Sequence, residues 1–183
     1  MGTSTMISLP PIPTWDGLHP LIIHFPIVLL LTAPLFVLIA IFMPVKAGRQ
    51  MYLAALLLML LGTISAFLSY ETGEAAGKLA ERTPEVNAAI ERHEGLAETT
   101  RLLFSVLTVI FAGSMAAPKA FKFEPTRRII VAISVVFLLF YASAMIVLVN
   151  TAHQGGMLVH QYGVHALVAP DTNSRPTVPY ERD

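Results

Sequence analysis

The stretch PLIIHFPIVLLLTAPLFVLIAIFM, residues 20–43, is apolar apart from Thr32 and a single ionisable side chain, His24. A helix needs about 20 such residues to cross the roughly 30 Å of hydrocarbon in a bilayer. Three further stretches have a similar character: residues 51–68, 102–117 and 129–149. The sequence therefore predicts an all-α fold, an integral membrane four-helix bundle within residues 20–168.

The third apolar stretch is the shortest, and an amphipathic segment, residues 84–101, leads into it. Its apolar and small residues recur at spacings near three and four, and glutamates separate them. Thr83 and Pro84 are typical of a helix start, with Thr as the N-cap and Pro as the first helical residue. This helix is expected to extend well beyond the bilayer.

The two ends of the chain are expected to be tails. Residues 1–19 are punctuated by prolines, and they lack the positively charged start and the cleavage site of a secretory signal. Residues 169–183 are polar and contain three prolines, which is typical of a disordered tail. No internal repeat is visible in the sequence.

Basic residues predict the orientation of the bundle. The loops after the first and third stretches contain one acidic residue, Glu124, and six basic ones: Lys46, Arg49, Lys119, Lys122, Arg127 and Arg128. In residues 70–101, four basic residues are diluted by seven glutamates. The positive-inside rule therefore places the two short loops in the cytoplasm and both termini outside. In a bacterial inner membrane, the outer side is the periplasm.

Composition excludes several kinds of chemistry. Hydrophobic residues make up 55% of the chain and charged residues 13%, and the formal net charge is zero, so nothing indicates a nucleic-acid partner. The chain has no cysteine, which excludes disulfides, cysteine-bound iron–sulfur clusters and covalently attached c-type haem. Neither a phosphate-binding glycine loop nor a GxSxG sequence is present, so no catalytic residue is assigned.

All six histidines fall on the predicted outer side. They are His19, His24, His93, His153, His160 and His165. His24 lies about one turn inside an apolar helix, where an ionisable side chain usually faces the bundle interior and has a partner there. His153 lies in NTAHQGG, residues 150–156, where polar side chains and two glycines are expected to end the helix.

Three functions are compatible with this histidine cluster. A b-type haem needs two histidines on facing helices, with His24 and His153 as the first choice of axial ligands and His19 and His93 as a second pair. A non-haem iron, copper or zinc ion could instead use these four histidines with a carboxylate, either Glu71 or Glu74. In a structural or assembly subunit, the histidines would only satisfy one another.

The segment HPLIIHFPIVLL, residues 19–30, resembles the opening signature of a bacterial membrane family catalogued as a domain of unknown function (number twenty-two thirty-one). A lone histidine before the third stretch, His93 in ERHEGLAETTRLLF, is similar to the family as well, as are residues 153–159 and 162–164. The family tends to have an aromatic residue in place of His160 and a glycine in place of His165. These two histidines therefore rank below the other four.

The resemblance also implies a function, because some members are joined to cytochrome-like or Rieske-like domains. Redox work is therefore expected by analogy. On this reading the chain is a cytochrome b-like electron-transfer subunit that contacts membrane lipid. Its partner would be a redox subunit or a periplasmic cytochrome.

Overall fold

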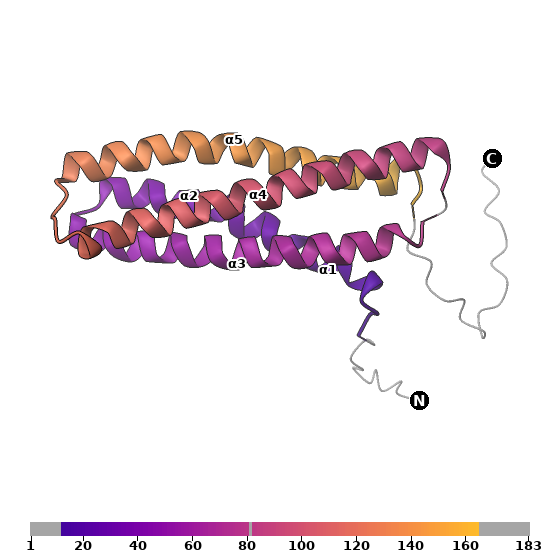
Figure 1. The fold of residues 1–183 in the computed structure, drawn as a ribbon, viewed down its shortest axis with the longest axis horizontal. Coiled ribbons are helices and arrows are strands. Elements are labelled where there is room, and N and C mark those ends of the chain that lie inside the picture. Colours follow the sequence, from indigo (N-terminus) through magenta and orange to yellow (C-terminus); the bar gives the residue numbers. More distant parts are fainter. Residues whose placement is uncertain (1–11, 81, 165–183) are drawn as a thin grey trace, which may run out of the picture.

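The computed structural model describes residues 12–80 and 82–164, and these residues are helical apart from short connections (Figure 1). A 3-10 turn, η1 (Asp16–Leu18), and a short helix, α1 (His19–Ile22), lead directly into α2 (His24–Phe42). Three longer helices follow: α3 (Val45–Gly77), α4 (Pro84–Ala120) and α5 (Arg127–His160). Counting η1, α1 and α2 as one segment, the described residues form four helices long and apolar enough to cross a membrane. This confirms the all-α prediction, while both expected tails lie largely or wholly outside the described residues.

The four long helices run up and down and form a ring. Helix α2 packs against α3 and α5, and α4 packs against the same two helices. The connections after α2 and α4 lie at one end of the bundle, which we call the basic end because it carries the six basic residues of the short loops (Figure 1). The opposite end holds α1, the α3–α4 connection and the end of α5, and we call it the histidine end.

The helix limits differ from the apolar stretches in an informative way. Helix α4 starts as predicted, since the Thr83 hydroxyl accepts a hydrogen bond from the Val86 backbone N–H at 3.2 Å. Helix α3, in contrast, continues for nine residues beyond Leu68. Hydropathy marks only the part of a helix that lies in hydrocarbon, so these extensions reflect packing between helices outside it.

The prediction that the fourth helix ends near residues 150–156 is wrong, because α5 continues through this segment to His160. The Asn150 side chain donates to the Ile146 carbonyl at 2.8 Å, and the Thr151 hydroxyl donates to the Val147 carbonyl at 2.9 Å. Both polar groups are therefore satisfied within their own helix. Each helical glycine costs about 1 kcal/mol relative to alanine, a cost that close packing against Gly155 can offset.

The helices form two similar hairpins, α2–α3 and α4–α5, although the sequence shows no repeat. Adding 74 to a residue number of α2, or 82 to a residue number of α3, gives the corresponding position of the other hairpin. In the core, buried positions correspond to buried positions. This holds for four pairs in the core: Leu30 and Phe104, Val37 and Phe111, Ala55 and Phe137, Met59 and Tyr141. The bundle thus has an approximate twofold arrangement about its long axis.

Hydrogen bonds between helices link the two hairpins in the core. The Tyr141 hydroxyl donates to the Leu30 carbonyl at 2.8 Å, and the hydroxyls of Thr63 and Thr108 lie 3.0 Å apart. Within the described part of the chain, no buried side-chain nitrogen or oxygen lacks a hydrogen-bond partner. Such pairing matters in a membrane, because hydrocarbon offers no water to satisfy a polar group.

Candidate functional site

The first histidine site is formed by His19 of α1 against α3. The His19 Nδ1 atom lies 2.9 Å from the Ser69 carbonyl oxygen and 3.3 Å from the Thr72 hydroxyl. The imidazole ring rests directly on Gly73, where an added Cβ would lie 2.7 Å from the ring Cε1. Only a glycine leaves room for the ring at this distance, so Gly73 is part of the site.

The second histidine site repeats this arrangement between α4 and α5. The His93 Nδ1 atom lies 3.1 Å from the Thr151 carbonyl oxygen. The ring rests on Gly155, where an added Cβ would lie 3.0 Å from Cε1. In both sites the carbonyl comes from a hydroxyl residue four positions before the glycine. His19 and His93 also occupy corresponding positions in the two hairpins.

The hydrogen bonds fix which ring nitrogen carries the proton in the neutral imidazoles. A carbonyl oxygen only accepts hydrogen bonds, so Nδ1 is the donor in both sites. The Thr72 hydroxyl is itself a donor to the Leu68 carbonyl at 2.9 Å, which leaves its oxygen free to accept from His19. Each Nε2 therefore has its lone pair available. An imidazole anchored through Nδ1–H in this way is the usual form of a metal-ligating histidine.

The two histidine sites lie close together at the histidine end. Gly77 is one turn beyond Gly73, and an added Cβ there would lie 3.6 Å from the Glu94 carboxylate and 3.9 Å from the Ile90 side chain. Helices α3 and α4 are therefore in contact at this level. His19 rests on Gly73, and His93 immediately precedes the Glu94 that faces Gly77, so the two histidines lie at similar heights along the bundle. Both side chains are partly buried.

The other described histidines are on the outside of the bundle. His24, His153 and His160 are exposed, and none of them forms a hydrogen bond within residues 12–80 and 82–164. The expectation that His24 faces the interior is wrong. Pro26 is buried, and two residues along a helix turn the side chain by about 200°, so His24 faces away from the core. His165 lies outside the described residues.

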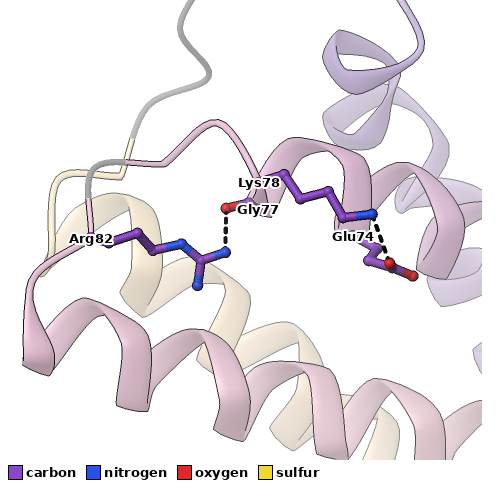
Figure 2. Close-up of polar contacts among 4 residues, drawn as sticks. All are labelled: Glu74, Gly77, Lys78 and Arg82. Atoms are coloured by element: carbon purple, nitrogen blue, oxygen red, sulfur yellow. Dashed lines mark hydrogen bonds and ion pairs between the residues drawn. The ribbon is translucent and has the colours of Figure 1, made fainter.

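The two candidate carboxylates are also on the surface. Glu71 is exposed, and Glu74 forms a salt bridge of 2.9 Å with Lys78 (Figure 2). This hydrogen bond to Glu74 raises the pKa of Lys78. Figure 2 also shows Arg82 donating to the Gly77 carbonyl at 2.9 Å, at the end of α3. Among the described residues, no group of three or more histidine, aspartate or glutamate side chains could hold a metal ion.

The sequence did not reveal that each of the two histidines packs on a glycine of a neighbouring helix. Gly73 and Gly155 stand at the end of two similar five-residue segments, SYETG (69–73) and TAHQG (151–155). Their shared pattern is a hydroxyl residue, two variable residues, Thr or Gln, and glycine. It is too short to be distinguished without knowing that each segment receives a histidine. Beside the first segment, the Arg101 guanidinium lies 4.2 Å from the centre of the Tyr70 ring.

Together these features define a four-helix membrane protein with two matched histidine sites at one end. The family model described as "Predicted membrane protein (DUF2231)" matches residues 16–167, and the chain belongs to this family. The match covers the histidine sites and all four long helices, and it confirms the resemblance seen in the sequence. No curated protein and no solved structure matches the chain.

Proposed function

We propose that the protein is a membrane-embedded, b-type haem-binding electron-transfer subunit, with His19 and His93 as axial ligands. One observation carries the proposal. Two partly buried imidazoles at one end of the bundle each donate from Nδ1 to a backbone carbonyl, at 2.9 and 3.1 Å, and leave Nε2 free. Anchoring of this kind orients a ligand and increases its basicity.

Haem suits this site better than a bare metal ion does. A porphyrin supplies four nitrogen ligands to its iron, so the protein needs to supply only two. A structural or catalytic zinc or copper ion in a protein usually has three or four side-chain ligands. Among the described residues, no group of three or more histidine, aspartate or glutamate side chains could supply that many ligands. When bound, haem would supply one-electron chemistry.

The axial pair differs from the one that the sequence favoured. His24 and His153 are exposed on the bundle surface, and their corresponding positions in the other hairpin are Glu98 and Glu71. His19 and His93 correspond to each other and share the same kind of anchor. A pair related by the twofold arrangement can approach one group from two sides, as bis-histidine ligation requires.

The distribution of charge supports an orientation for this activity. The basic end would face the cytoplasm of a bacterial inner membrane, and both termini and the histidine end would face the periplasm. None of the described histidines lies at the basic end, so the proposed haem would serve one face only. Its redox partner would be a second subunit or a periplasmic cytochrome that docks at the histidine end.

A reduced-minus-oxidised visible spectrum tests the proposal. The protein is produced with a haem supply, purified in detergent, and examined beside elemental analysis for iron, copper and zinc. The wild type should show the Soret and α bands of a low-spin b-type haem. His19→Ala and His93→Ala should each abolish these bands or convert them to a high-spin form.

His24→Ala and His153→Ala are the matched controls, because they remove imidazoles from the same end. Full bands are expected in both. Loss of the bands in these two variants, with retention in His19→Ala, would instead support the pair favoured by the sequence. A stoichiometric metal without haem bands would favour the non-haem site, and neither signal would favour a structural subunit.

A further inference from the structure

A large apolar groove opens at the basic end between α4 and α5, where the α2–α3 connection also lines it. It extends along α4 and α5 as far as Leu103 and Val147. Its volume is about 1360 Å³. Aliphatic and aromatic side chains of both helices line it, among them Val106, Ile110, Val136 and Phe140. Figure 1 shows α4 crossing the bundle, so that it diverges from α5 toward the basic end. The groove is therefore the space left where these two helices separate.

Four basic residues line the same groove. Lys46 and Arg49 come from the start of α3, Lys119 from the end of α4, and Arg127 from the start of α5. The Arg127 guanidinium donates to the Ile41 carbonyl at 3.3 Å. The one salt bridge among the described residues, Lys78 with Glu74, lies at the histidine end. The groove thus combines an apolar wall with a rim of four basic residues, none of which forms a salt bridge within the described residues.

We propose that this groove binds one anionic phospholipid, with an acyl chain against the apolar wall and the phosphate among the four basic residues. An acyl chain matches the wall, and a phosphate accepts charge-assisted hydrogen bonds from arginine and lysine. Basic pockets between transmembrane helices bind anionic headgroups for the same reason. This inference is independent of the proposed haem function, because the four basic residues that would bind the phosphate lie at the opposite end of the bundle from the two histidines.

A second copy of the chain fits the groove less well. In a twofold dimer the same surface meets itself, so the basic rims of two copies would face each other. Like charges in that arrangement repel, and the one carboxylate of the loops at this end, Glu124, is outnumbered by the four basic residues of the rim and forms no salt bridge with them among the described residues. A phosphate brings the missing negative charge.

Native mass spectrometry of the delipidated, detergent-purified protein tests the proposal. Phosphatidylglycerol and phosphatidylcholine with identical acyl chains are titrated separately. Phosphatidylglycerol should bind with at least about ten-fold higher affinity, the size expected for a few surface charges. In the double variant Lys46→Gln/Arg49→Gln, this preference should fall about ten-fold. Lys78→Gln/Arg92→Gln removes two charges from the histidine end and should leave the preference unchanged.

A pair of neighbouring substitutions tests the groove itself. Ser143 lines the groove, whereas the adjacent and equally exposed Ala142 does not. Ser143→Phe should reduce phosphatidylglycerol binding at least five-fold, and Ala142→Phe should leave it unchanged. The proposal is overturned if the two lipids bind equally well to the wild type. It is also overturned if the groove mediates a dimer that Ser143→Phe dissociates.

Discussion

The two hairpins agree at the histidine end and differ at the basic end. In α2–α3 the helices approach closely: an added Cβ on Gly48 would lie 2.9 Å from the Ala40 carbonyl oxygen. The corresponding residues of α4–α5 are Ile130 and Ser114, and both line the open groove. A branched side chain in place of a glycine keeps the helix backbones apart. The α4–α5 hairpin thus opens into the groove, which the end of the closed α2–α3 hairpin also lines, whereas a histidine site occurs in each hairpin.

The core shows the same contrast. Inside the first hairpin the buried positions are Leu30, Val37, Ala55 and Met59, and the corresponding positions of the second are Phe104, Phe111, Phe137 and Tyr141. The four rings contact one another in tilted and edge-to-face pairs, with centroids 4.8 to 5.6 Å apart. Rings fill the wider interior that larger helix separation creates. The proposed haem site therefore lies at the end where the two hairpins agree, and the proposed lipid site lies at the end where they differ.

The largest expected effect comes from adding one methyl group to each hairpin. Gly48→Ala should lower the free energy of unfolding by about 2 kcal/mol, because the new Cβ meets backbone that cannot move aside. Gly113→Ala, in α4, should raise it by up to about 1 kcal/mol, since nothing lies within 4 Å of the added atom. Unfolding in detergent with increasing denaturant measures both. Equal effects of the two substitutions would contradict the difference in helix separation.

A smaller effect is expected at the histidine end, where the hairpins should behave alike. Gly73→Ala and Gly155→Ala should each lower the free energy of unfolding by about 1 kcal/mol, because the added Cβ displaces an imidazole and weakens its hydrogen bond. Gly156→Ala is the control, because its Cβ would meet no atom within 4 Å. Thermal unfolding of the three variants in one detergent measures the difference. The matched sites would be refuted if Gly73→Ala and Gly156→Ala had the same stability.

The fold was predictable because its signal is local. Four apolar stretches of membrane length determine four helices, and the Thr83 cap marks a helix start that the structure confirms. The helix through residues 150–156 was not predictable. Its glycine and polar residues resemble a terminus until the His93 ring and the internal hydrogen bonds are seen. The hydrogen bond from His93 to Thr151 joins residues 58 positions apart.

The candidate site was predictable only in part, for the same reason. Sequence reasoning gathered the histidines at one end, and the partly buried His19 and His93 do lie at that end, each packed on a glycine of a neighbouring helix. It ranked His24 higher because an ionisable residue inside an apolar stretch is unusual. Which face of a helix is buried depends on its neighbours, and in α2 the buried side carries Pro26. The glycines beneath the rings carry no chemical signal of their own.

The smallest effect tests whether the hairpins are coupled where they differ most. The hydroxyls of Tyr52 and Ser134 lie 2.9 Å apart at the edge of the groove, and the two residues occupy corresponding positions of α3 and α5. A double-mutant cycle with Tyr52→Phe and Ser134→Ala should give a coupling energy of about 0.6 kcal/mol, the average for hydrogen bonds between membrane helices. Phosphatidylglycerol should leave this coupling unchanged if its phosphate stays at the basic rim. A coupling near zero would mean that the aromatic core alone joins the two hairpins at this level.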